Sequence, residues 1–144
     1  MIADKKVFRY RYDYDPIELH RFIKDRYFPF INAEELEVIL ENRLRVNQSQ
    51  PLKGQLLAAG DWIEYTHLRS DEEENLPPID VLYEDEHILA ICKPAGLPVT
   101  PSGRFYFNSI VIQLREKYQN DELSPLHRLD LETSGVLLFG KTKK

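Results

Sequence analysis

Residues 68–78 constrain the fold of this chain most, because they divide it into two segments. Four consecutive acids, residues 71–74, precede the adjacent prolines Pro77 and Pro78. Like charges in a row repel one another, and paired prolines favour an extended backbone. We therefore expect one domain in residues 8–68, a linker in residues 69–78 and a second domain in residues 79–144.

Composition is typical of a soluble globular protein, with 42% hydrophobic and 30% charged residues. No apolar run is long enough to cross a bilayer, and the N-terminus lacks the apolar core of a secretory signal. The single cysteine, Cys92, lies in an apolar run, which favours a buried, inert thiol in a reducing compartment. These features predict a cytoplasmic protein that does not contact membranes.

In the first segment, apolar and charged residues alternate and then change to helical spacing. Asp15-Pro16 predicts a helix start, with Asp15 as the cap and Pro16 at the first helical position. Asn32, with Glu35 three residues on, predicts the start of a second helix. The expected strands are residues 7–12, 44–47 and 62–66, the last of them after a turn at Gly60-Asp61.

In the second segment, two apolar strands at about 80–84 and 87–92 flank an acidic turn, as in a hairpin. Asn108 is expected to cap a helix, and the continuous apolar run 136–139 predicts a strand buried on both faces. The histidines have no metal-ligand spacing to other His, Cys or acidic residues, so no metal site is expected. Of these histidines, His67 and His87 are expected to be solvated and His20 to lie on the exposed side of its helix.

The most informative string follows this helix and reads His127-Arg128-Leu129-Asp130, then Leu-Glu132-Thr133-Ser134-Gly135. It is long, mixes charged and small residues, and leads into the apolar strand. The string resembles the H-R-L-D-x-x-T-S-G active-site signature of RluA-type pseudouridine synthases, which isomerise uridine in RNA. The resemblance implies that Asp130 is catalytic and that Arg128 holds the RNA open.

Residues 43–47 and 60–63, together with the two predicted helices, resemble an S4-type RNA-binding domain. Asn42 and Gln48 stand where that family usually has glycine. The fold expected is therefore α+β: a small S4-like domain of two helices and a β-hairpin, followed by an incomplete mixed α/β-sheet synthase domain. The resemblance implies RNA contacts from basic residues on the helices and the next strand, by position Arg21, Lys24, Arg43 and Arg45.

The net charge of −5 does not favour binding to phosphates across the whole surface. Seven of the acids, however, lie in residues 71–74 and 84–86, away from the basic clusters. A local basic face is therefore compatible with the composition. The expected partner is structured RNA, with ribosomal RNA the first choice and transfer RNA the second.

Pseudouridine formation breaks the N1–C1′ bond, turns the uracil and rejoins it through C5. Nothing is oxidised, so neither a metal nor a redox cofactor is expected, and one carboxylate is enough, as nucleophile or as base. Asp130 and Glu132 could instead be the carboxylate pair of a glycoside hydrolase. This alternative is weak, because hydrolases bring their two acids from separate strands.

In RluA-type enzymes the catalytic domain continues well beyond the signature strand. We therefore expect the 144 residues to be part of a longer enzyme, monomeric at full length, and inactive alone. The alternative is a truncated S4-type RNA-binding protein without catalysis.

Overall fold

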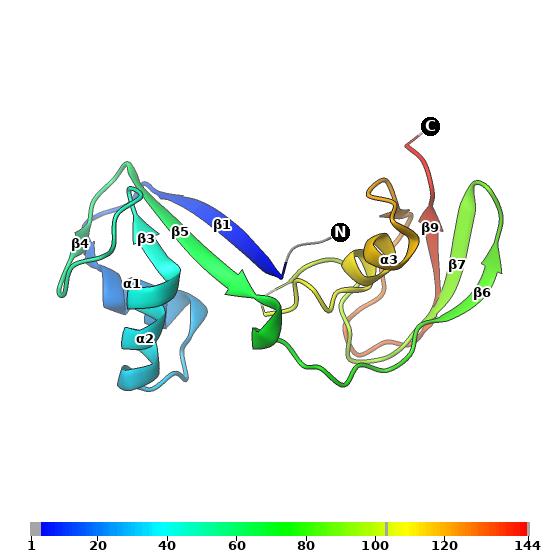
Figure 1. The fold of residues 1–144 in the computed structure, drawn as a ribbon, viewed down its shortest axis with the longest axis horizontal. Helices are drawn as coiled ribbons and strands as arrows, with labels where there is room; N and C mark the ends of the chain where they lie inside the picture. The colour runs from blue at the N-terminus through cyan, green and yellow to red at the C-terminus, as the bar shows by residue number, and fades with distance from the viewer. Residues whose placement is uncertain (1–3, 103, 144) are drawn as a thin grey trace. The chain divides into compact units, whose positions relative to one another are not determined.

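The computed structural model describes residues 4–102 and 104–143. It divides the chain into two compact units, one of Lys5–Leu68 and one that begins at Arg69 and includes Asp4. Both units combine helices with antiparallel sheets, so the chain is mixed α and β, compatible with the α+β class (Figure 1).

The first unit consists of a three-stranded sheet, a two-stranded ladder and two helices. The sheet has the order β1-β5-β3, and its strands are β1 (Lys5–Tyr12), β3 (Leu44–Val46) and β5 (Asp61–Leu68). The ladder pairs β2 (Ile17–Glu18) with β4 (Leu56–Leu57). Helices α1 (Leu19–Tyr27) and α2 (Ala33–Arg43) lie on the same side of the sheet (Figure 1). Their buried leucines and Ile23 pack with Tyr12 and Ile63 of the sheet.

The predicted start of the first helix is wrong. Helix α1 begins at Leu19, after an N-cap at Glu18 that makes no side-chain capping bond. Ile17 and Glu18 are held in the ladder with β4, and the Leu19 N–H donates to the Gln55 carbonyl at 2.9 Å. This pairing keeps the residues after Pro16 extended, so Asp15 does not act as the cap.

The predicted start of the second helix is confirmed. Asn32 is the N-cap of α2, and its side-chain oxygen accepts the Glu35 N–H at 2.9 Å. This bond satisfies one of the free N–H groups at the helix start.

The strand β3 ends in a two-residue turn at Asn47 and Gln48, both of which have positive φ (50° and 68°). Val46 and Ser49 on either side exchange hydrogen bonds of 2.9 and 3.0 Å. Positive φ at both central residues is typical of the type I′ hairpin turn, in which glycine is favoured at the second position. Gln48 therefore holds a backbone conformation that its side chain disfavours.

Replacing Gln48 with glycine is expected to stabilise the first unit by about 0.5–1 kcal/mol, because glycine adopts positive φ at little cost. Trp62, the only tryptophan, lies in this unit and reports its unfolding in urea. Gln50→Gly is the matched control, because Gln50 is outside the positive-φ residues and gains no relief. A lower urea midpoint for Gln48→Gly would contradict the prediction.

The second unit contains a four-stranded antiparallel sheet of order β6-β7-β9-β8. The strands are β6 (Asp80–Glu84), β7 (Ile88–Lys93), β8 (Ser124–Pro125) and β9 (Gly135–Gly140), and the unit also has the 3₁₀ turn η1 (Arg69–Asp71) and helix α3 (Ile110–Tyr118). The strands predicted at about 80–84, 87–92 and 135–140 are confirmed. The core lies between α3 and the sheet, where Ile110 and Leu114 meet Leu89, Leu137 and Phe139.

The strand β9 is buried on one face only, so the prediction of burial on both faces is wrong. Leu137 and Phe139 are fully buried, whereas Val136 is 57% exposed. Helix α3 covers one face of the sheet (Figure 1), and side chains alternate between the two faces of a strand. The apolar run is therefore half-buried.

The acidic run in the predicted linker is bound to the second unit. Both carboxylate oxygens of Glu72 accept backbone N–H groups, from Tyr106, Phe107 and Asn108, at 2.7–2.9 Å. Glu72, in the predicted linker of residues 69–78, therefore satisfies donors just before α3. Asn108 is not the helix cap, because Ser109 holds that position and the Asn108 side chain donates to the Glu73 carbonyl.

The histidines differ in their surroundings. His67 is buried beside the rings of Phe8 and Tyr65, so its predicted solvation is wrong. His87 is exposed, as predicted. His20 is half-buried, and its Nε2 lies 2.8 Å from Glu37. His67 lies on β5 with its side chain on the core face of the sheet. Local sequence does not reveal this burial, because the face of a strand that packs on the core is decided by distant residues.

Candidate active site

The signature string forms the loop of residues 126–134, which connects β8 to β9. At its start, the Leu126 N–H donates to the Leu138 carbonyl at 2.9 Å. The Leu138 N–H donates in turn to Nε2 of His127 at 3.1 Å, so this ring nitrogen carries no proton in the bond. The His127 side chain therefore fastens the loop to β9.

A turn and a glycine shape the other end of the loop. The Thr133 N–H donates to the Asp130 carbonyl at 3.0 Å. Gly135, the first residue of β9, has φ of 148°, a conformation that residues with a side chain rarely adopt. Asp130 thus begins a tight turn and is itself exposed.

Lys93, the last residue of β7, lies fully buried beneath this loop. Its ammonium group donates to the carbonyls of Pro94, Leu131 and Thr133 at 3.0, 3.1 and 2.8 Å. The Leu131 carbonyl also accepts the Gly96 N–H at 2.8 Å. All three ammonium protons are therefore used, two of them to hold the loop backbone just after Asp130.

Burial lowers the pKa of Lys93, and the negative charge of Asp130 opposes this shift. The ammonium and the carboxylate thus stabilise each other's charge across the loop. Sequence reasoning missed this function of Lys93. The available signal is a lysine that ends an apolar strand and precedes Pro94-Ala95-Gly96, because a charged residue at the end of a buried strand needs partners.

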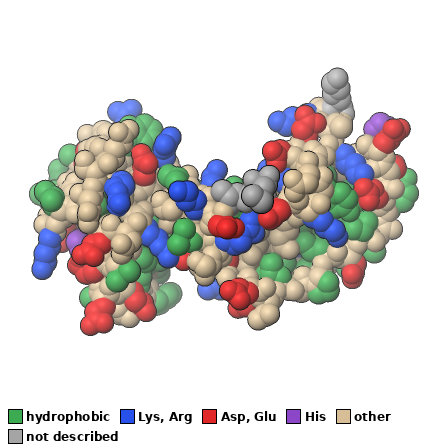
Figure 2. Space-filling view, viewed as in Figure 1, with side chains coloured by type: hydrophobic (Ala, Val, Ile, Leu, Met, Phe, Trp, Pro, Cys, Tyr) green, Lys and Arg blue, Asp and Glu red, His purple; other side chains and the backbone are tan. Residues whose placement is uncertain are grey.

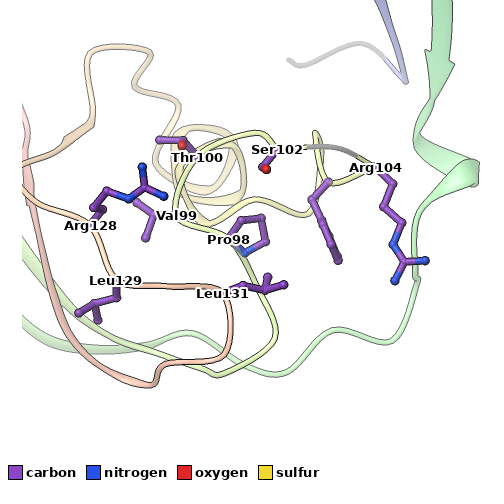
Figure 3. A pocket seen from close by; sticks show the side chains of 9 residues that line it. Pro98, Val99, Thr100, Ser102, Arg104, Arg128, Leu129 and Leu131 are labelled. Atoms are coloured by element: carbon purple, nitrogen blue, oxygen red, sulfur yellow. The ribbon is translucent and has the colours of Figure 1, made fainter. Parts of the chain in front are cut away.

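A hollow of about 340 Å³ lies next to the loop. Arg128, Leu129 and Leu131 line it from the signature loop, and residues 98–100, 102, 104 and 105 line it from the segment before α3. Figure 3 shows the guanidinium groups of Arg128 and Arg104 at opposite ends of the hollow, with Thr100 and Ser102 between them. The hollow therefore offers two cations and two hydroxyls around an apolar floor.

Among the predicted site residues, the structure places Arg128 at this hollow and Asp130 in the same loop. Arg104, whose guanidinium lies 5.3 Å from the Phe105 ring centroid, is a lining residue that sequence reasoning did not single out. It lies outside the signature, in a loop of irregular sequence without a periodic pattern.

The other four predicted RNA contacts belong to the first unit. Arg21 and Lys24 are exposed on α1, and Arg21 lies 3.6 Å from Asp25. Arg43 ends α2 and is half-buried. Arg45 donates from Nη1 to the carbonyls of Glu41 and Leu44 at 3.1 and 2.6 Å, and so caps the C-terminal end of α2.

The described residues contain neither a cluster that could bind a metal ion nor a helix that could span a membrane. Residues 4–102 and 104–143 contain no group of three or more His, Cys, Asp or Glu that could hold a metal ion. No helix in that same part of the chain is long and apolar enough to cross a membrane.

Comparison with known proteins connects the signature loop to a family. The family of RNA pseudouridylate synthases matches residues 87–144. Human pseudouridylate synthase RPUSD2 is 41% identical over 87 residues, which are 60% of this chain and 16% of the human protein. An uncharacterized RNA pseudouridine synthase of Synechocystis, slr1592, is 42% identical over 86 residues, which are 60% of this chain and 30% of that protein.

A bacterial relative carries the RluA name itself. The dual-specificity RNA pseudouridine synthase RluA of Vibrio vulnificus is 43% identical over 77 residues, which are 49% of this chain and 30% of that protein. Residues 87–144 are therefore similar to RNA pseudouridylate synthases, and the relatives at about 40% identity support a synthase of the RluA type. The chain spans less than a third of the length of these relatives.

Proposed function

We propose that the protein that contains this chain converts uridine to pseudouridine in RNA, with Asp130 as its catalytic residue. One observation carries the proposal. Asp130 is exposed at a tight turn within the segment that matches the family, and the buried Lys93 ammonium holds the backbone just after it through the carbonyls of Leu131 and Thr133. A carboxylate fixed in this way is available to a substrate without rearrangement of the loop.

The reaction breaks the N1–C1′ bond and forms a C5–C1′ bond, while C5 loses its hydrogen as a proton and N1 gains one. Asp130 acts at the sugar, as nucleophile or as base at the ribose. No electron is gained or lost overall, so the proposal needs no cofactor. The negative charge of Asp130 in turn favours the charged form of the buried Lys93 and opposes the lowering of its pKa by burial.

The target uracil is stacked in structured RNA, so the enzyme must extrude the nucleotide before it reacts. We assign Arg128 to this step. Its guanidinium lines the hollow next to the catalytic loop and can stack on a base while it donates to phosphate. Ribosomal RNA is the first proposed substrate and transfer RNA the second, for a cytoplasmic monomer.

We further propose that the first unit is an S4-like RNA-binding module. Two helices on one side of a small sheet, followed by the turn at Asn47 and Gln48, support this assignment. Arg21 and Lys24 are the stronger RNA contacts, since they are exposed on α1. Arg45 is weaker, because its guanidinium is bound to the end of α2.

The test uses preparations of the protein that contains residues 1–144, chosen without regard to activity. Unmodified ribosomal and transfer RNA transcripts are incubated with it, digested to nucleosides and analysed for pseudouridine by mass spectrometry. Pseudouridine in either RNA supports the proposal. If the preparations bind the RNA but none of them forms pseudouridine, the result favours the alternative of a non-catalytic RNA-binding protein.

Glu132 provides an internal control for the assignment of Asp130. Both carboxylates are exposed in the same loop. Glu132→Gln is expected to change the rate less than about threefold, because the isomerisation needs one carboxylate and not a pair. A loss comparable to that of Asp130→Asn, measured in the same nucleoside assay, would restore the carboxylate-pair interpretation.

A further inference from the structure

The three-stranded sheet of the first unit has one face that its helices do not cover. Tyr12, Val46 and Ile63 point into the core with α1 and α2. Residues next to them along the same strands lie on the opposite face, because side chains alternate along a strand. An antiparallel sheet with one packed face commonly leaves the other in solvent.

Strand register places a tryptophan among basic side chains on that open face. Trp62 is directly opposite Arg11, and Glu64 is opposite Arg9 on one side and Arg45 on the other. Lys5, also on this face, extends the row along β1. We call Lys5, Arg9, Arg11 and Trp62 the sheet surface, and leave out Arg45 because its guanidinium is bound to the carbonyls of Glu41 and Leu44.

The sheet surface is positive although the chain is not. It holds three cations, Lys5, Arg9 and Arg11, and Glu64 lies opposite Arg9 in the strand register, whereas the whole chain has a net charge of −5. Figure 2 shows blue side chains over β1 and red ones over α2. The separation of charge between the sheet and α2 therefore makes a local basic face.

The side chains of the sheet surface are available for contact. Trp62 is 48% exposed, and the side chains of Arg9 and Arg11 are 69% and 58% exposed. Arg9 lies 3.6 Å from Glu64, and Arg11 lies 3.2 Å from Asp13. The Arg11–Asp13 pair is exposed at both side chains and contributes little, so phosphate can replace Asp13. Glu64 is only 22% exposed, but the Arg9 side chain beside it remains 69% exposed to a phosphate.

Trp62 is held rigidly while its ring remains in solvent. The Asn47 N–H donates to the Trp62 carbonyl at 2.8 Å, and the Asn47 side-chain oxygen accepts the Trp62 N–H at 2.9 Å. The Asn47 amide also donates to Asp61 at 2.9 Å. A fixed backbone reduces the entropy lost when the indole binds a partner.

We propose that the sheet surface binds unpaired RNA nucleotides, with one base stacked on Trp62 and the adjacent phosphates on Arg9 and Arg11. This inference rests on the proposed function, because it takes RNA as the substrate. An aromatic ring flanked by cations is the arrangement by which proteins bind single strands without reading their sequence. The sheet surface lies on a different element from Arg21 and Lys24, so it adds a second contact region.

The single tryptophan makes the stacking directly measurable. The 144-residue chain is titrated with oligouridine of about 12 nucleotides while Trp62 fluorescence is recorded. Stacking of a base on the indole is expected to quench the emission. Inorganic polyphosphate, which has the charge but no bases, is expected to bind without comparable quenching. No quenching by oligouridine, or equal quenching by polyphosphate, would overturn the stacking on Trp62.

Variants test the same surface by anisotropy of a labelled oligouridine. Trp62→Ala is expected to weaken binding roughly 5- to 100-fold, as for loss of one stacked base. Arg11→Glu is expected to weaken it and to flatten its salt dependence. Lys53→Glu is the matched charge reversal, at an exposed lysine before β4 and outside the sheet, and is expected to change affinity much less. Circular dichroism confirms that each variant is folded, and Trp62→Phe, which keeps an aromatic ring, is expected to restore part of the affinity.

Equal effects of Arg11→Glu and Lys53→Glu, or unchanged binding by Trp62→Ala, would overturn the inference. So would a tryptophan emission that shifts with protein concentration alone, because that result assigns the surface to a second copy of the chain. These outcomes are separate from failure of the proposed function. If the protein forms pseudouridine but substitution of Trp62 leaves its RNA affinity unchanged, the proposed function stands and only the RNA contact at the sheet surface is rejected.

Discussion

Replacement of Asp130 with asparagine is expected to abolish pseudouridine formation in an active protein that contains residues 1–144. Asparagine keeps the size of the side chain but has neither negative charge nor basicity. It can therefore neither attack the sugar nor remove a proton, and we expect a loss of at least ~10²-fold, the usual contribution of one positioned group. The rate is measured by nucleoside analysis of an unmodified transcript.

Asp130→Asn is also expected to leave RNA affinity within about twofold of the original, because the positive side chains that contact phosphate are unchanged. Affinity and rate thus separate the chemical step from binding. Retained activity at equal RNA occupancy would remove Asp130 from the mechanism. A parallel loss of affinity and rate would instead assign Asp130 to binding.

Replacement of Lys93 with methionine is expected to cause the largest loss of stability. The substitution leaves the carbonyls of Pro94 and Thr133 without the Lys93 donor, whereas the Leu131 carbonyl keeps its bond from the Gly96 N–H. Orphaned polar groups in a partly buried site cost about 1–3 kcal/mol each, so we expect the free energy of unfolding to fall by roughly 2–4 kcal/mol after relaxation. Urea unfolding followed by circular dichroism measures this change.

The matched control is Lys117→Met, which removes an exposed lysine from α3 in the same unit. It is expected to change stability by less than about 0.5 kcal/mol. Hydrogen exchange shows which region Lys93→Met destabilises. Faster exchange at the Thr133 and Gly96 amides would place the loss of stability in the loop that Lys93 holds. A stability of Lys93→Met equal to that of Lys117→Met would contradict this function of Lys93.

Features of the fold that depend on neighbouring residues were predictable from sequence. The apolar runs at β6, β7 and β9 lie where the sequence predicts strands, and Asn32 caps α2 through a residue only three positions away. In each case the spacing of residues in one short window carries the information.

Features that depend on distant partners were not predictable. Glu72 binds backbone groups more than thirty positions along the chain, and Lys93 binds carbonyls at Leu131 and Thr133. By local pattern, Glu72 is a repelling acid in a linker and Lys93 is the polar end of a strand. Helix α1 starts late for the same reason, because β4 captures Ile17 and Glu18. The signature identifies the loop from sequence alone, whereas the buried lysine that binds this loop is evident only in the structure.

Release of tritium from uridine labelled at C5 tests the central claim most directly. The C5–C1′ bond can form only if C5 loses its hydrogen, so each pseudouridine made must release one labelled proton to water. The account predicts that an active protein containing residues 1–144 releases tritium in a single turnover, in step with pseudouridine, and that Asp130→Asn bound to the same RNA releases none. Equal release by the Asp130→Asn variant would contradict it.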